Sequence, residues 1–236
     1  PYWLTYPEVV KVCGATPTYL ECKKENKFKF TAEELKAAIT PKTKMLIFNS
    51  PSNPTGAVYN EEEVRAIAKV CEEAEIFVLS DEIYEKLCYN GVKPFSMAAC
   101  SEKMMDLTIT VNGVSKTYAM TGWRLGYLTA PAPIMKEMMK IHQYAIMCAP
   151  TASQFGAIEA MRSCDAEVEM MRMEYNRRRT MIYEGLRSIG LDSFEPEGAF
   201  YIFPRIAEAT LLSSSLILRR WDFTARRVLP RDIKMR

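Results

Sequence analysis

Short apolar runs alternate with amphipathic segments along most of this chain. Met45 to Phe48, Ile76 to Leu79 and Leu107 to Val111 are apolar runs of the length typical of buried strands. Two further strands are predicted at Tyr19 to Cys22 and at Arg124 to Thr129, the latter closed by prolines. Because strands alternate with helical segments, we expect parallel pairing and right-handed crossovers, which are features of an α/β fold.

Two helices have sequence signals at their N-termini. Thr31 followed by Glu34 has the form of a capping box, which predicts a helix through Ile39. Asn60 with Glu63 predicts a second helix start of the same kind. Four apolar residues then recur on one face of the second helix: Val64, Ile67, Ala68 and Cys71. This second helix is therefore expected to be amphipathic.

The last third of the chain is mainly helical in pattern. The helical stretch begins near Pro133 and includes the charged run from Glu167 to Arg179. Such a run predicts one solvated helix face. A strand is predicted after it, at Phe200 to Phe203.

A change of domain is predicted near Cys164. We expect residues 1–164 to form a large domain with a mainly parallel sheet flanked by helices. Residues 165–236 are expected to form a smaller α+β C-terminal domain. Length alone does not decide between one and two domains, because folding units usually run to roughly 100 to 200 residues.

Charge and composition narrow the functional classes. The chain has 236 residues, 48% of them hydrophobic and 25% charged, which indicates a globular protein. Its 31 basic and 29 acidic residues give a net charge of +2, too balanced for nucleic acid or an anionic membrane as partner. No apolar run reaches the roughly 20 residues of a membrane span. A soluble, cytoplasmic protein is expected.

Cysteine and histidine usage excludes several kinds of site. The seven cysteines are odd in number, scattered and never spaced as CxxC, which favours reduced thiols over disulfides or a metal site. His142 is the only histidine, so a serine or cysteine hydrolase has a single candidate for its base. A hydrolase is therefore disfavoured.

Two loops that follow predicted strands carry polar groups suited to a ligand. The loop NSPSNPTG contains Asn53, whose amide both donates and accepts hydrogen bonds. The alternative interpretation of this motif is a plain turn without a ligand. In SDEIY, Asp81 ends an apolar strand and Tyr84 follows three residues later. A helix N-cap aspartate with a packing tyrosine is the alternative interpretation. Ligands of open α/β sheets gather where strands end, which makes both loops candidates.

A lysine and an arginine lie close together in NGVSKTYAMTGWRLGY. Lys116 follows a predicted strand and becomes a nucleophile if its pKa falls, while Arg124 has the forked guanidinium that binds phosphate. Considered without the other, a lysine or an arginine in such a position is more often a solvated surface charge than a functional group.

Together, SNPTG, DEIY, SK and GWRLG occur in the order and approximate spacing of the class I and II aminotransferases, a family of enzymes dependent on pyridoxal 5'-phosphate (PLP). The chain resembles this family from Pro1 to about residue 210. The resemblance includes AFYIFP at Ala199 to Pro204 and EYNRRR at Glu174 to Arg179.

The resemblance implies a role for each matching residue. Lys116 bonds the cofactor and moves the proton, and Asp81 pairs with the pyridine nitrogen, which preserves the electron sink. Asn53 and Tyr84 hydrogen-bond the phenolic oxygen, and Arg124 binds the phosphate. Trp3 is similar to an aromatic residue that lines the substrate side of the cofactor in this family. The alternative is that Trp3 is buried in the hydrophobic core.

The chain departs from the family's pattern in several places. We expect it to be incomplete at both ends, without the glycine-rich phosphate loop and with an aberrant segment from residue 211 onward. Gly113 replaces the serine or threonine that often contacts the phosphate. The substrate-carboxylate arginine cannot be assigned, because Lys234 and Arg236 lie in unlike sequence.

The expected function is amino-group transfer from an L-amino acid to a 2-oxo acid such as 2-oxoglutarate, by a homodimer. A PLP-dependent lyase of the cystathionine-cleaving kind is one alternative, since those enzymes are similar across all four loops. An inactive remnant that binds an intact partner is another, because it requires no complete active site. Neither a metal nor nucleic acid is expected to take part.

Overall fold

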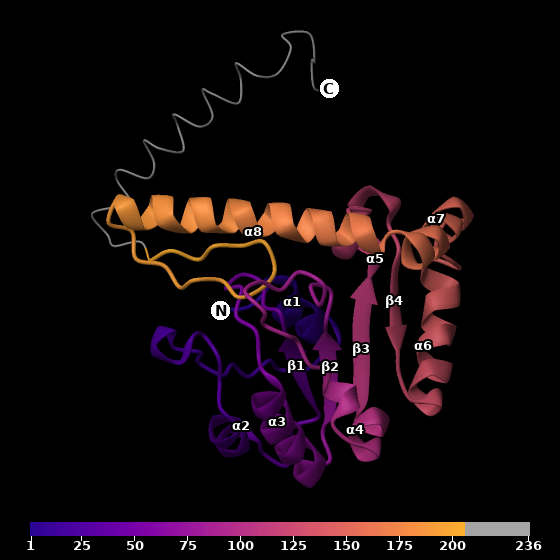
Figure 1. The fold of residues 1–236 in the computed structure, drawn as a ribbon. Helices are drawn as coiled ribbons and strands as arrows, with labels where there is room; N and C mark the ends of the chain where they lie inside the picture. Colours follow the sequence, from indigo (N-terminus) through magenta and orange to yellow (C-terminus); the bar gives the residue numbers. More distant parts are fainter. Residues whose placement is uncertain (206–236) are drawn as a thin grey trace, which may run out of the picture.

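The computed structural model of this chain describes residues 1–205 and contains a mixed β-sheet (Figure 1). The strands are β1 (Met45–Asn49), β2 (Phe77–Asp81), β3 (Thr108–Gly113) and β4 (Gly126–Thr129). They lie in the order β1-β2-β3-β4, with β1, β2 and β3 parallel and β4 antiparallel to β3. The predicted α/β class with a mainly parallel sheet is therefore confirmed.

The pairing of β4 is the antiparallel exception in the mainly parallel sheet. Between β3 and β4 the chain forms only the short helices α5 (Val114–Thr117) and η3 (Thr121–Trp123). A parallel return requires a crossover that carries the chain back along the sheet, usually through a longer helix. Because this connection stays at the carboxyl end of β3, β4 runs back in the opposite direction.

Helices surround the sheet. The longer ones are α1 (Thr5–Val12), α2 (Ala32–Ala38), α3 (Glu61–Ala74), α4 (Glu102–Leu107), α6 (Ala132–Ala145), α7 (Thr151–Ser163) and α8 (Asp165–Ser188). Single 3-10 turns lie at η1 (Lys24–Asn26) and η2 (Met97–Ala99). Figure 1 shows α6 and α7 beyond β4, and α8 running past the end toward which β3 points. The helical pattern predicted from Pro133 onward is confirmed.

The main hydrophobic core lies between α3 and one face of the parallel strands. Burial alternates along β1, so that Leu46 and Phe48 face this core. The predicted apolar face of α3 is buried against them, and both predicted capping boxes form their two reciprocal hydrogen bonds. Local patterning thus determined the helix start and the buried face together.

Two predicted strands are wrong. Tyr19 to Cys22 forms no ladder in the described chain, and Tyr19 instead stacks on Tyr2 at 5.2 Å between ring centroids. Phe200 to Phe203 is irregular, with isolated bridges at Gly198 and Pro204. An apolar run becomes a strand only where a neighbouring strand supplies hydrogen bonds. On either side of the second segment, Ala199 N donates to the Leu87 carbonyl and Arg205 N to the Asp192 carbonyl, both of them in loops.

The charged run Glu167 to Arg179 lies within α8, and most of it is solvated as predicted. Exposed ion pairs follow the helix at i,i+3 and i,i+4 spacing, for example from Glu174 to Arg177 at 2.8 Å. Arg179 is the exception, because its side chain is buried and donates to Glu195 at 2.9 Å and to the Pro196 carbonyl at 3.1 Å. The interpretation as one solvated face is therefore wrong at Arg179.

The helices α7 and α8 meet at Cys164, where the sequence predicts the domain change. Residues 206–236, with Lys234 and Arg236, lie outside the described residues. The division into residues 1–164 and 165–236 therefore stays a prediction.

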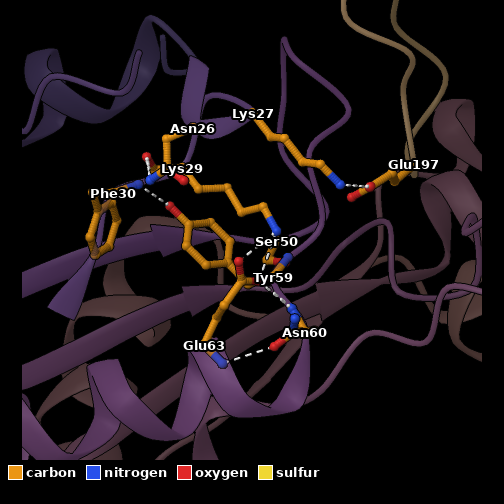
Figure 2. A network of polar contacts seen from close by, with 9 residues as sticks. All are labelled: Asn26, Lys27, Lys29, Phe30, Ser50, Tyr59, Asn60, Glu63 and Glu197. Atoms are coloured by element: carbon orange, nitrogen blue, oxygen red, sulfur yellow. Dashed lines mark hydrogen bonds and ion pairs between the residues drawn. The ribbon is translucent and has the colours of Figure 1, made fainter. Parts of the chain in front are cut away.

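A buried ion pair joins the segment after η1 to the start of α3 (Figure 2). Lys29 is buried, and its Nζ lies 2.8 Å from each carboxylate oxygen of Glu63. The same ammonium lies over the Tyr59 ring, at 5.5 Å from the centroid. Tyr59 Oη accepts from Phe30 N at 2.9 Å. These contacts hold an irregular segment against the core.

Replacing Lys29 by methionine is expected to lower the free energy of unfolding by about 2 kcal/mol, because Glu63 loses its buried partner. The estimate is below the full cost of breaking a buried pair, since the Glu63 side chain is 36% exposed. Urea unfolding followed by circular dichroism measures the change. Lys36→Met is the control, because its pair with Glu73 at 3.5 Å is exposed and should contribute little. Equal stability of both variants would contradict the prediction.

Candidate active site

The parallel strands end side by side, and the predicted site residues follow those ends. The register pairs Asn49 with Asp81, the last residues of β1 and β2. β3 ends at Gly113, three residues before Lys116. Because parallel strands present their carboxyl ends at one edge, loops that are distant in sequence converge there. Asn53, Asp81 and Lys116 therefore lie at the same edge of the sheet.

The loop after β1 is an irregular turn that positions Asn53. Asn49 Oδ1 accepts from Asn53 N at 2.8 Å, and Asn49 Nδ2 donates to the Asp81 carbonyl at 3.0 Å. Ser52 and Gly56 close the turn through backbone hydrogen bonds of 2.9 Å. The Asn53 side chain is thereby directed away from the turn, and its Nδ2 donates to Tyr201 Oη at 3.3 Å.

Asp81 accepts two hydrogen bonds. Tyr6 Oη donates to Oδ2 at 2.6 Å, and Ile83 N donates to Oδ1 at 3.2 Å. No helix begins after Asp81, where residues 83–86 form a turn, so the alternative of an N-cap aspartate is wrong. Burial, followed by the negative charge of Asp81, raises the pKa of Tyr6 well above its ordinary value. Tyr6 therefore stays protonated and donates a hydrogen bond to the carboxylate.

Tyr84 and Lys116 lie beside an aromatic cluster. Tyr84 is buried, and its hydroxyl lies 2.8 Å from Tyr201 Oη. Burial, followed by the hydrogen bond with Tyr201, raises the pKa of Tyr84 above its ordinary value. Lys116 Nζ lies 5.9 Å from the Tyr84 ring centroid and 5.5 Å from that of Phe200. The lysine is thus half-buried beside the two rings, at the distance of cation–π contacts.

Arg124 and Gly113 lie at the neighbouring strand ends. Arg124 is exposed in a left-handed conformation (φ 52°), and its Nη1 donates to the Thr121 carbonyl at 2.7 Å. The hydrogen bonds found within residues 1–205 do not join Arg124 to Lys116. A Cβ added at Gly113 would lie 3.1 Å from Gly126 Cα, so a larger residue would crowd the pairing of β3 with β4.

Trp3 lies at the edge of the site. Its side chain is 46% exposed, so the alternative of a core tryptophan is wrong. The indole packs edge-on against Tyr6, with 5.5 Å between ring centroids. Trp3 therefore reaches Asp81 only through Tyr6.

Sequence reasoning missed Tyr6, Phe200 and Tyr201. AFYIFP drew attention to the last two only as part of a strand, and Tyr6 lies in the same N-terminal segment as Trp3. The hydrogen bonds that join the Tyr6 and Tyr201 hydroxyls to Asp81, Tyr84 and Asn53 span 75, 117 and 148 residues in the sequence. No local pattern encodes such contacts.

A close approach of two glycines brings Tyr201 to Asn53. Gly198 N donates to the Gly56 carbonyl at 2.8 Å, and Glu197 N donates to the same oxygen at 2.9 Å. A Cβ on Gly198 would lie 2.7 Å from side-chain atoms of both Pro51 and Val58. Only glycine allows the two loops to approach so closely.

Gly198→Ala is expected to lower the free energy of unfolding by about 2 kcal/mol, because the methyl group overpacks a rigid contact. Thermal unfolding measures the loss. Gly185→Ala is the matched control, since a Cβ there meets no atom within 4 Å and alanine favours helix α8. A Gly198→Ala variant as stable as Gly185→Ala would contradict the close packing of this contact.

The described part of the chain has neither a membrane-spanning helix nor a cluster of metal ligands. No helix within residues 1–205 is long and apolar enough to cross a membrane. The same residues hold no group of three or more histidine, cysteine, aspartate or glutamate side chains suited to a metal ion.

Comparisons with known proteins agree on one family. Residues 1–222 match the family described as "Aminotransferase class I and II". An aspartate aminotransferase of Bacillus sp. (strain YM-2) is 49% identical over 210 residues, which are 89% of this chain and 54% of that protein. The crystal structure of an aromatic aminotransferase from Pyrococcus horikoshii OT3 aligns with a TM-score of 0.84 at 42% identity, covering 87% of this chain and 56% of that one.

A third relative, an aromatic-amino-acid aminotransferase of Thermococcus litoralis, is 42% identical over 90% of this chain and 55% of its own length. The chain thus spans about half the length of the curated relatives that it matches. The match nevertheless includes the ends of all three parallel strands and the loops that follow them. On this evidence the chain belongs to the class I and II aminotransferase family.

Proposed function

We propose that this protein transfers an amino group from an L-amino acid to a 2-oxo acid, with PLP as its cofactor. The family is PLP-dependent in general. The observation that carries the proposal is the convergence of Asn53, Asp81, Tyr84 and Lys116 at the carboxyl edge of the sheet. The names of the relatives favour aspartate and aromatic amino acids as amino donors.

The chemistry of the side chains fits the cofactor. Asn53 Nδ2 and Tyr84 Oη both contact one phenolic oxygen, that of Tyr201, which supports their proposed binding of the phenolic oxygen of the cofactor. PLP carries a phenolic oxygen next to its aldehyde. Lys116 supplies the amine, and Asp81 supplies a carboxylate whose two oxygens are oriented by Tyr6 and Ile83. The residues present therefore suit the group.

Each residue then has a proposed task. When bound, the cofactor supplies the electron sink that makes the α-carbon proton of an amino acid removable. Asp81 holds a proton at the pyridine nitrogen, which strengthens that sink. Lys116 anchors the cofactor and moves the proton at the substrate α-carbon. Asn53 and Tyr84 donate to the phenolic oxygen.

Arg124 and Trp3 have less structural support. We propose that Arg124 binds the cofactor phosphate, for which its permanent charge and forked donors are suited. Its exposure leaves the guanidinium available, and its one turn contact uses Nη1 only. Trp3 is proposed to line the substrate side, which is supported by its exposed ring and by its contact with Tyr6, the residue that donates to Asp81.

We propose further that the protein is a cytoplasmic homodimer. Helix α6 buries none of its residues, and several large apolar side chains on α6 and α7 are exposed: Met139, Ile141, Tyr144, Phe155 and Ile158. Exposed apolar patches of this kind support a subunit interface. Light scattering coupled to size exclusion measures the mass in solution.

The proposal is tested by titrating the purified chain with PLP while recording its absorbance. We expect a new absorbance band that borohydride removes, with the reduced adduct mapped to Lys116 by mass spectrometry. Activity requires a 2-oxo acid acceptor and follows ping-pong kinetics. Release of ammonia and pyruvate without an acceptor would instead indicate the lyase, and the absence of any band would indicate the inactive remnant.

A further inference from the structure

Tyr201 Oη lies at the point where the two proposed donors to the cofactor meet. Asn53 Nδ2 donates to this oxygen at 3.3 Å, and Tyr84 Oη lies 2.8 Å from it. We infer that Tyr201 is a further residue of the cofactor site, and that its hydroxyl competes with the phenolic oxygen of PLP for Asn53 and Tyr84. This inference rests on the proposed function, which assigns those two groups to that oxygen.

Hydrogen-bond geometry makes the two oxygens competitors. Hydroxyl hydrogen bonds are effective over about 2.5 to 3.0 Å, and Tyr84 has a single proton to donate. A ligand oxygen that uses both Asn53 and Tyr84 has to take the position toward which they are directed. Tyr201 Oη occupies that position. The tyrosine therefore gives up its two contacts when the ligand oxygen takes them.

The backbone around Tyr201 allows its side chain to leave. The segment is anchored just before it, where Gly198 N donates to the Gly56 carbonyl and Ala199 N to the Leu87 carbonyl, both at 2.8 Å. Residues 201–203 belong to no helix or strand, and Tyr201 is only half-buried. Its ring meets Tyr84 edge-on at 5.8 Å between centroids. Moving the ring therefore breaks no ladder, and the packing that it gives up is its contact with the small cluster of Tyr84, Leu87 and Ala199.

Competition predicts the sign of a mutational effect. In Tyr201→Phe the ring remains but the competing hydroxyl is removed, so the apparent dissociation constant for PLP should fall. The expected change is about three- to tenfold, the size of one net hydrogen bond. If Tyr201 instead supported the bound cofactor as a third donor, the same substitution would raise the dissociation constant.

The test compares PLP with its analogue that lacks the 3-hydroxyl group. The full chain, Tyr201→Phe and Tyr175→Phe are titrated with both ligands by absorbance or fluorescence, without measuring activity. Tyr175 is the matched control, because its ring stacks on Phe200 at 5.5 Å in the same cluster and it forms no hydrogen bond with Asn53 or Tyr84. Should Tyr201→Phe fail to fold by circular dichroism, Tyr201→Leu replaces it.

We expect tighter PLP binding in Tyr201→Phe, no change with the deoxy analogue, and no change for Tyr175→Phe with either ligand. Unchanged or weaker PLP binding in Tyr201→Phe would overturn the competition, as would an equal gain for the deoxy analogue. Failure of every variant to bind PLP would overturn the proposed function itself. The two failures are therefore distinguishable.

Discussion

Lys116→Ala is expected to abolish the borohydride-stable PLP adduct and to lower amino-group transfer by about 10⁴-fold. The reason is that one side chain both anchors the cofactor and moves the proton, and positioned proton transfer contributes up to about 10⁴. Lys116 is half-buried beside the Tyr84 and Phe200 rings, at the carboxyl end of β3. Peptide mapping of the reduced protein and a coupled transaminase assay measure the two effects.

The control for Lys116 is Lys93→Ala, because Lys93 is an exposed lysine far from the strand ends in sequence. This variant should keep both the adduct on Lys116 and the rate of the parent chain. If Lys116→Ala formed as much adduct on another lysine as the parent chain forms, Lys116 would not be the residue that bonds the cofactor. Retained turnover would contradict the assignment of Lys116 more directly.

Asp81→Asn is expected to retain PLP and to lower turnover by about 10³-fold. A unit charge pair at about 4 Å contributes roughly 4 kcal/mol at an effective dielectric constant of 20, and each 1.36 kcal/mol corresponds to tenfold in rate. The neutral amide cannot hold the proton on the pyridine nitrogen, so only the electron sink is weakened. Steady-state rates beside a PLP titration separate these two effects.

The hydrogen-bond partners of Asp81 can also bind an asparagine at this position. An asparagine oxygen can still accept from Ile83 N, and the Tyr6 hydroxyl can rotate to accept from the new amide. The fold should therefore survive. Asp106→Asn, at an exposed site on α4, is the control and should leave the rate unchanged. Equal turnover in Asp81→Asn and the parent would refute the role of the carboxylate.

Local sequence patterns predicted the elements that carry the site. The two capping boxes and the apolar face of α3 depend on residues within a few positions of one another, and all three were confirmed. The three parallel strands were recognised because buried strands are short apolar runs. Since their ends share one edge, the sequence also predicted which loops approach each other.

The tertiary structure decided the contacts between distant segments. It gave β4 its antiparallel direction, buried Arg179 against Glu195, and left residues 200–203 without a strand. In each case the outcome depends on a partner far along the chain, which periodicity does not encode.

The same division holds within the site. The sequence by itself determined Asn53, Asp81, Tyr84 and Lys116 as candidates, because each lies at the carboxyl end of a strand or in the loop that follows it. Only the folded chain placed Tyr6 on Asp81, 75 residues away, and Tyr201 on Tyr84, 117 residues away. Motifs determine which groups are present, whereas hydrogen-bond partners depend on how loops converge after the strands have paired.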